Sequence, residues 1–315
     1  MNVRFERFKR MVTMRHFDEA CLEGVPTREI HGELHTGIGQ EAIGAGMAES
    51  LRQGDAVVST HRNHYHAIAA GVPLQPMLAE IFERETGLCK GRGGHMHIFA
   101  PEQNFSSTGI VGASLPVALG YAYGFWMEGK DNVAVAATGD GGTNNGTFHE
   151  CFNIAGAWKL PFVLLVENNS LAISVPIDDV LATPTIAERA ASYNAWGKKV
   201  DGTNVDTFAA AFAEAVDHAR SGKGPAIIEA TCYRFRGHFE GDHDSYRKME
   251  EKKRIRETYD PLELTKRDLI QDGVATEGEL ETIIQTSKEE MNALLARVRN
   301  DPMPNVRNAL EYIFV

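Results

Sequence analysis

The sequence predicts an α/β fold in which helices flank a parallel sheet. Three short apolar runs, at residues 133–138, 162–166 and 226–230, alternate with longer stretches of helical periodicity. This alternation is typical of strand-helix-strand units, whose strands run parallel and are buried on both faces. A chain of 315 residues with 43% hydrophobic and 24% charged residues can bury one large core. We therefore expect one α/β domain over residues 1–315, with its core at about 40–250, a helical segment before it and a helical extension at about 257–315.

The elements follow in order along the chain. Residues up to about 100 combine helices with loops rich in Gly and His, and the glycines of 86–97 suit close backbone approach. Beyond them, the pattern predicts helices near 112–127, 145–158 and 206–221, and strands near 133–138, 162–167 and 226–231. A polar loop follows at about 234–248. Thr276 and Glu279 then form a capping box before a last helix with regularly spaced apolar residues.

A glycine-rich turn closes the first of these strands, at Gly139-Asp140-Gly141-Gly142. Glycine adopts backbone angles closed to other residues and lets a ligand approach the main chain. Thr143 or Asn144 can cap the helix that follows, and Pro161 ends it. We expect the buried face of this helix to carry Phe148, Phe152, Ile154, Ala155 and Trp158.

Polar side chains end both strands of this unit. Asp140 follows the first strand and Asn169 the second, and a right-handed crossover puts both at the carboxyl edge of one sheet. Carboxylate and amide oxygens suit Mg²⁺, while the N–H groups and dipole at the start of the intervening helix favour a diphosphate. The unit therefore predicts a metal-diphosphate site; the alternative is an ordinary strand-helix-strand unit with a Gly-rich turn.

Further motifs occur in order along the chain: Gly39-Gln40-Glu41-Ala42, Thr60-His61-Arg62-Asn63-His64, Gly91-Arg92-Gly93-Gly94-His95-Met96-His97, Gly109-Ile110-Val111-Gly112-Ala113, Tyr233-Arg234-Phe235-Arg236-Gly237-His238 and Ser245-Tyr246-Arg247. With them, the sequence resembles the α subunit of the heterotetrameric E1 component of thiamine-dependent 2-oxo acid dehydrogenase complexes over about residues 10 to 250. The resemblance implies a thiamine diphosphate-binding fold whose first helix lies around residues 11–21.

The resemblance assigns the metal and diphosphate ligands. It implies that the side chains of Asp140 and Asn169 and the carbonyl of Leu171 bind Mg²⁺, and that the N–H groups of Gly141 and Gly142 hold the diphosphate of thiamine diphosphate. Any residue type can offer a carbonyl, so Leu171 also has a purely structural interpretation.

Further cofactor contacts are implied by the same resemblance. Gly109 and Val111 match positions on the pyrimidine side of the cofactor, although a glycine turn before a helix explains them equally. Arg62 matches a diphosphate-binding arginine, whose guanidinium fork suits that anion. His61 matches a cofactor position where the family often has Tyr.

Two histidines match the family's channel above the cofactor. His64 and His238 would come from separate loops, donate to phosphate or substrate, and carry protons near neutral pH. Glu41 is interpreted as a structural carboxylate at a helix start, because its motif lies away from the pyrimidine in the family.

The resemblance also implies partners. The cofactor acts as an electron sink when the bond next to a carbonyl breaks, and the acyl unit passes to the lipoyl group of an E2 component. The glutamate that activates the aminopyrimidine comes from the β subunit in the family. This chain is therefore expected to form half an active site within an α2β2 tetramer.

The substrate prediction rests on the loop Gly237-His238-Phe239-Glu240-Gly241-Asp242. It is closer to the acetoin dehydrogenase branch, in which acetoin is cleaved to acetaldehyde and an acetyl group. The alternative substrates are pyruvate and branched-chain 2-oxo acids. Phe239 stands where eukaryotic pyruvate dehydrogenases have a regulatory serine.

Two alternatives come from other classes. A non-catalytic nucleotide- or phosphate-binding α/β module would use the Gly-Asp-Gly turn for another diphosphate, but a Walker A lysine and a Gly-x-Gly-x-x-Gly helix start are absent. A stand-alone thiamine enzyme would need a second, pyrimidine-binding domain.

Composition and charge narrow the environment. The net charge is −11 without a Lys/Arg run, so we expect no nucleic-acid partner. Four scattered cysteines suggest reduced thiols, and no apolar segment approaches membrane-spanning length. Residues 1–16 carry basic side chains, but Glu6 and the lack of serine argue against a transit peptide, which favours a cytoplasmic protein.

Overall fold

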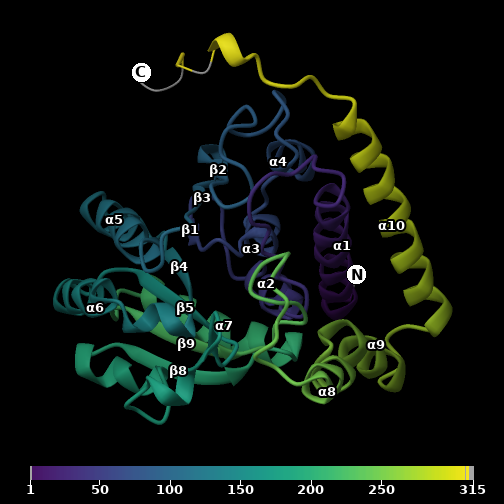
Figure 1. Ribbon diagram of the computed structural model, residues 1–315. Coiled ribbons are helices and arrows are strands. Elements are labelled where there is room, and N and C mark those ends of the chain that lie inside the picture. Colours follow the sequence, from purple (N-terminus) through teal and green to yellow (C-terminus); the bar gives the residue numbers. More distant parts are fainter. Residues whose placement is uncertain (1, 309, 312–315) are drawn as a thin grey trace.

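A computed structural model describes residues 2–308 and 310–311. Its centre is a seven-stranded sheet with the order β2-β3-β1-β4-β5-β9-β8, parallel except for the β2–β3 pair (Figure 1). The strands are β1 Ala56–Ser59, β2 Phe99–Ala100, β3 Phe105–Ser107, β4 Ala134–Gly139, β5 Phe162–Asn168, β8 Trp196–Asp201 and β9 Ala226–Thr231. Two further strands, β6 Leu171–Ala172 and β7 Val175–Pro176, form a small hairpin. The predicted α/β class is confirmed.

Helices cover both faces of the sheet. The ten are α1 Val3–Gly24, α2 Glu41–Met47, α3 His64–Ala69, α4 Leu74–Ile81, α5 Ser114–Met127, α6 Gly146–Trp158, α7 Val205–Arg220, α8 Met249–Tyr259, α9 Pro261–Gln271 and α10 Glu277–Arg299, within the described residues. Helices α5 and α6 share one hydrophobic cluster with the sheet, and α1, α2, α4 and α7 share the other. Strand β5 is buried along its whole length, as expected for a strand covered on both faces.

The β4-α6-β5 unit matches the prediction closely. Asn145, rather than Thr143 or Asn144, caps α6 by accepting the N–H of Thr147. Strands β4 and β5 pair in parallel, so Asp140 and Asn169 follow neighbouring strand ends. The buried face of α6 is narrower than expected: Ile154 and Trp158 are 37% and 51% exposed, because they lie away from the helix face that packs on the sheet.

The N- and C-terminal helices pack side by side. α1 contacts α10 along the edge of the molecule (Figure 1). The predicted capping box of Thr276 and Glu279 is present at the start of α10. None of the described helices combines the length and apolarity needed to cross a membrane.

A buried carboxylate on α4 organises the Gly-rich loop after it. Glu80 is fully buried and accepts the N–H groups of Cys89 at 2.7 Å, Gly91 at 2.9 Å and Gly93 at 2.6 Å. This carboxylate replaces the hydrogen bonds that a regular element would give these backbone groups. The glycines are needed because a Cβ at Gly91 would lie 2.7 Å from the backbone of Glu83.

Candidate active site

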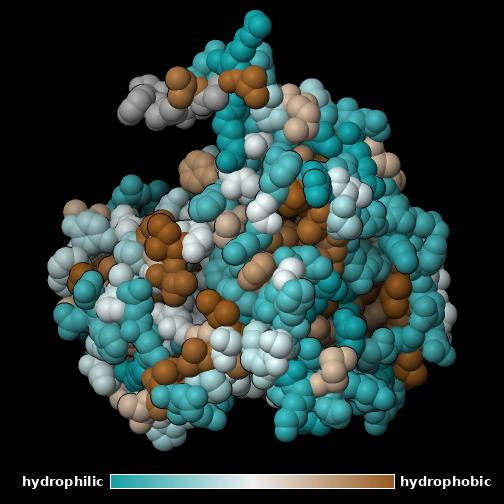
Figure 2. Space-filling model, in the orientation of Figure 1, coloured by the Kyte–Doolittle hydropathy of each residue, from teal (hydrophilic) through white to brown (hydrophobic). Residues whose placement is uncertain are grey.

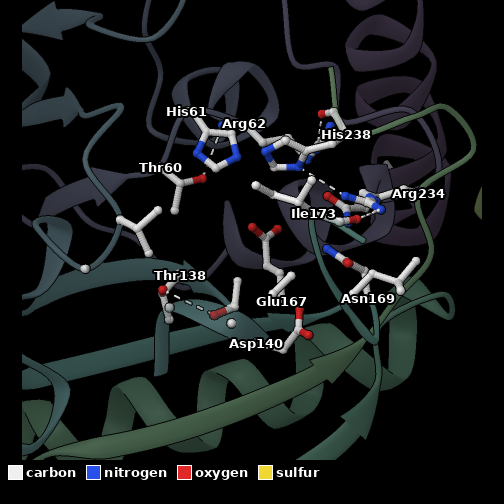
Figure 3. Close-up of a pocket in the computed structure, with 18 of the residues that line it drawn as sticks. Thr60, His61, Arg62, Thr138, Asp140, Glu167, Asn169, Ile173, Arg234 and His238 are labelled. Atoms are coloured by element: carbon white, nitrogen blue, oxygen red, sulfur yellow. Dashed lines mark hydrogen bonds between the residues drawn. The ribbon is translucent and has the colours of Figure 1, made fainter. Parts of the chain in front are cut away.

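A cavity of about 250 Å³ opens at the carboxyl ends of β4 and β5. Figure 3 shows His61 and His238 on one side of it, Asp140 and Asn169 on the other, and Glu167 between them. Its lining comes from Gln40, Thr60, His61, Arg62, Thr108, Ile110, Val111, Gly112, Thr138, Gly139, Asp140, Gly141, Gly142, Glu167, Asn169, Leu171, Ala172, Ile173, Arg234 and His238. Most of the residues predicted for the site therefore border one space.

The two predicted metal ligands have oxygens without protein partners. Asp140 is 1% exposed, and its Oδ2 accepts no hydrogen bond from the described residues; the same holds for the buried Oδ1 of Asn169. Burial raises the pKa of Asp140 to about 6, although backbone N–H groups and Arg234 act in the opposite direction. Buried oxygens without partners are costly, and a water molecule, a hydrogen-bond donor or a cation in the cavity would stabilise them.

The turn between them is shaped by glycine. A Cβ on Gly142 would collide with the hydroxyl of Thr138, and one on Gly141 would collide with Ala172. The segment Asp140–Asn144 forms a short 3-10 turn that leads into α6. Main-chain groups can therefore approach a ligand in the cavity closely.

Two buried guanidinium groups face the same cavity, and no carboxylate of the described residues lies within salt-bridge distance of either. Arg62 is 7% exposed; its side chain donates to the carbonyls of Thr36 and His238, the latter at 2.8 Å. Arg234 is 3% exposed; it donates to the carbonyl of Ile173 at 2.7 Å and to Nδ1 of His238 at 3.0 Å, and its Nε has no partner among the described residues. Burial lowers the pKa of both groups. An anion in the cavity would compensate this buried positive charge.

The cavity histidines are kept neutral. Burial lowers the pKa of His61 to about 3 and, with the Arg62 and Arg234 charges, that of His238 to about 4. Both can thus accept or donate one hydrogen bond without carrying charge at neutral pH.

His64 lies elsewhere. Its ring is 1% exposed, its Nδ1 lies 2.6 Å from Oδ1 of Asp18, and the edge of Phe17 packs against it. It does not line the cavity. The histidine that packs against His61 and His238 is His35, whose ring centroid lies 4.4 Å from that of His61 and 5.0 Å from that of His238. The sequence held no spacing signal for His35.

Of the remaining predicted contacts, Val111 lies on the rim and Gly109 is outside the lining. Val111 lines the cavity and is 58% exposed, and Gly109 immediately precedes Ile110, which is 72% exposed. Together with Ile173, which is 57% exposed, Ile110 and Val111 form an apolar rim. Ile173 holds a left-handed φ of 56°, a conformation that β-branched residues rarely adopt.

Among the lining residues without a role predicted from the sequence, two are charged, Glu167 and Arg234. Glu167 is 3% exposed, accepts the hydroxyl of Tyr65 and lies 3.3 Å from Nε2 of His66. The sequence feature that could have pointed to Glu167 is its position directly before Asn168-Asn169 at a strand end. Arg234 stood in a quoted motif, but only the fold shows that its guanidinium turns into the cavity (Figure 3).

Glu41 lies outside the cavity lining. It is 1% exposed, forms an ion pair with Arg15 and accepts the N–H of Gly39 at 3.0 Å. Arg15 also contacts Asp260, so its guanidinium connects α1 both to Glu41 at the start of α2 and to the residue before α9. This geometry agrees with the structural interpretation of Glu41.

Comparison with known proteins identifies the family. Residues 9–307 match the family described as Dehydrogenase E1 component. This chain belongs to the dehydrogenase E1 family. The α subunit of the pyruvate dehydrogenase E1 component from Rhizobium meliloti is 39% identical over 300 residues, covering 95% of this chain and 86% of that relative. The α subunit of acetoin:2,6-dichlorophenolindophenol oxidoreductase from Bacillus subtilis is 37% identical over 309 residues, covering 98% and 92%.

Membership makes this E1 chain part of a thiamine diphosphate-dependent oxidoreductase. The residues of the cavity fit that cofactor. The guanidiniums of Arg62 and Arg234 suit its diphosphate. The oxygens of Asp140 and Asn169 that lack partners among the described residues would suit a cation bound with it.

Proposed function

We propose that this chain is the E1 α subunit of a dehydrogenase complex, that it binds thiamine diphosphate through Mg²⁺, and that its substrate is acetoin. One observation supports the binding part: the same cavity is bordered by buried oxygens and two buried guanidiniums that have no hydrogen-bonding or carboxylate partners, respectively, in the part of the chain that the structure describes. A diphosphate with a divalent cation satisfies both sets of groups at once.

The residues divide the work as follows. Asp140, Asn169 and the carbonyl of Leu171 would hold Mg²⁺, while Arg62 and the N–H groups of Gly141 and Gly142 would hold the diphosphate. When bound, the thiamine ring supplies an electron sink for breaking the bond next to a carbonyl. The neutral imidazoles of His61 and His238 would orient the substrate by hydrogen bonds and exchange protons with it.

A β subunit is proposed to complete the site. The relatives are named as α subunits of their enzymes. A cavity of about 250 Å³ is smaller than the roughly 300–1,000 Å³ of typical small-molecule sites, and its apolar rim is exposed. Figure 2 shows hydrophobic side chains over the region where Figure 1 labels β4 and β5. We propose an α2β2 assembly that transfers the acyl unit to the lipoyl group of an E2 component.

Acetoin is favoured because the loop after β9 resembles the acetoin branch and because His61 and His238 stay neutral beside Ile173. Pyruvate is the second candidate, since Arg234 could pair with a substrate carboxylate and an α subunit of pyruvate dehydrogenase is among the similar relatives. We also propose a cytoplasmic location, which cell fractionation tests.

The binding proposal is tested by calorimetric titration of thiamine diphosphate and Mg²⁺ into this chain alone and into the chain co-expressed with its β partner. We expect Mg²⁺-dependent binding that is stronger in the assembled enzyme. No binding in either form would contradict the proposal.

The substrate proposal is tested by turnover of the assembled enzyme with an artificial electron acceptor. Acetoin should give a higher kcat/KM than pyruvate or branched-chain 2-oxo acids. A higher kcat/KM for pyruvate would replace acetoin by the second candidate while leaving the cofactor proposal intact.

A further inference from the structure

Three histidines from separate segments meet beside the cavity. His35 precedes α2, His61 follows β1 and His238 follows β9. One ring nitrogen of each lies within 4.8 Å of the corresponding nitrogens of the other two. The ring centroids of His61 and His238 are 5.2 Å apart. We call His35, His61 and His238 the histidine triad.

The spacing of the triad is close to that of a metal site. Tetrahedral zinc with Zn–N bonds of about 2.0–2.1 Å keeps its ligand nitrogens about 3.4 Å apart. Side-chain rotations that shift each nitrogen by about 1 Å would bring the triad to this geometry. His61 and His238 border open space in the cavity, so their rings have room to rotate.

The surroundings of His35 favour a metal ligand. Its Nδ1 lies 3.2 Å from Nε2 of His95, which leaves Nε2 of His35 for a metal. Metal-binding histidines commonly donate from their other ring nitrogen to a carboxylate, a backbone carbonyl or water, and the ring of His95 takes that position here. The carboxylate of Glu33 lies 3.9 Å from Nε2 of His35 and, being 55% exposed, can move to supply a fourth ligand in place of water.

We propose that the histidine triad binds a transition-metal ion of borderline softness, such as Zn²⁺, at a site distinct from the oxygen ligands Asp140 and Asn169. Imidazole nitrogens suit Zn²⁺ and Co²⁺, whereas Mg²⁺ prefers oxygen. Because His61 and His238 line the cavity, an ion held there stands in the path to it and inhibits turnover. The binding claim stands alone, and only the inhibition rests on the proposed function.

Charge sets the strength of this site. The imidazoles are neutral at physiological pH, so protons compete little with the metal. Arg234 opposes binding, since its Nη1 donates to Nδ1 of His238 at 3.0 Å and must turn away if that nitrogen is needed. Arg62 adds a second positive charge. We therefore expect reversible binding, with Kd on the order of 10 µM, rather than a permanent structural ion.

Co²⁺ alone serves as the probe, because tetrahedral Co²⁺ has a strong ligand-field absorption. The full chain is titrated with Co²⁺ in excess Mg²⁺, which occupies the oxygen ligands. We expect one equivalent of tetrahedral Co²⁺ and loss of its absorption when Zn²⁺, the stronger binder, is added.

Variants identify the ligands. His35→Gln and His61→Tyr should each lower Co²⁺ affinity at least tenfold, whereas Asp140→Asn and the matched control His149→Gln should retain it. His149 is exposed and contacts Tyr193, away from the triad. Unfolding midpoints of both triad variants are measured, so that a misfolded variant is not counted as a lost ligand.

Three outcomes overturn the metal site: no Co²⁺ binding by the parent chain, binding that survives in both triad variants, or binding that is lost in Asp140→Asn. Failure of the proposed function is a separate result, because it would be seen as no binding of thiamine diphosphate in the calorimetric titration. Zn²⁺ that binds the triad but leaves turnover of the assembled enzyme unchanged would overturn the inhibition alone.

Discussion

Asp140 and Asn169 present buried oxygens to a cavity in which no described protein group donates to these atoms. The arrangement is unfavourable in the chain alone and becomes favourable when a cation is shared between the oxygens and an anion. Arg62 and Arg234 are the converse case: their buried positive charges are bonded to backbone carbonyls and would be stabilised by an anion. At the scale of single residues, therefore, groups left unsatisfied within the chain carry the functional information.

Asp140→Asn tests this directly. It removes the charge but keeps the shape, so we expect Mg²⁺-dependent affinity for thiamine diphosphate to fall about 100-fold in the assembled enzyme. Calorimetry with the assembled enzyme measures the loss, and Asp217→Asn, an exposed carboxylate on α7, is the matched control. Equal affinities in both variants would contradict a ligand role for Asp140.

Residue types at strand ends were readable from the sequence, whereas side-chain directions were not. Asp140 and Asn169 were found because each follows an apolar run. His64 shared a motif with Arg62, but the first turn of α3 directs its ring toward Asp18 and away from the cavity. Long-range folding of loops brings Arg234 into the cavity and places His35 against His61 and His238, and local pattern does not encode either position.

At the scale of elements, α4 holds the Gly-rich loop at residues 86–97 through one side chain, that of Glu80. Glu80→Gln keeps one acceptor oxygen but replaces the other by an NH2 group, which cannot accept the N–H groups bound there. We expect a loss of about 1–3 kcal/mol in the free energy of unfolding, measured by urea denaturation, and faster proteolysis within residues 86–97. Glu102→Gln is the exposed control. Unchanged proteolysis would show that the loop holds its shape without the carboxylate.

The α1–α10 contact should depend on pH through His16. This buried side chain lies 3.0 Å from the hydroxyl of Ser287, and burial lowers its pKa, helped by the charges of Lys288 and Arg15. Since the unfolded chain binds the proton more readily, stability should fall as pH drops below about 6.5. His16→Asn should therefore lose less stability than the parent between about pH 7.5 and pH 5.5 in denaturant titrations. An equal loss in both would exclude His16 as a cause.

Elements with strong periodicity were predicted well, and short or exposed ones were missed. β4, β5 and β9 lie within a residue or two of their expected bounds, and α10 begins directly after the expected cap, Thr276. Strand β8 alternates intermediate and exposed residues at the sheet edge and carries two lysines, so it resembled a loop. β1 and β3 are only four and three residues long, and their pairing is a tertiary effect.

At the scale of the whole molecule, we propose one cooperative domain. α1 packs against both α2 of the core and α10 of the C-terminal extension, so the ends are not separate modules. Far-UV circular dichroism and tryptophan fluorescence should report coincident unfolding transitions. Two separated transitions would contradict the single domain and show that the chain unfolds in two parts.

Assembly should depend on the apolar rim. Ile110→Asp places a charge on a 72% exposed position, so it should not destabilise the chain but should weaken association with the β partner at least tenfold. Sedimentation of the co-expressed subunits measures this. Val306→Asp, at an 86% exposed position in the C-terminal segment, is the control and should assemble normally.

The left-handed backbone of Ile173 bears on how this enzyme could be engineered. A β-branched residue in that conformation costs about 1–3 kcal/mol, while its carbonyl fixes Arg234 and its side chain forms part of the rim. A screen for heat tolerance alone would favour Gly or Asn at this position, because both relax the backbone. Such a screen would select against the apolar contact, so thermostabilisation of this chain has to be selected together with turnover.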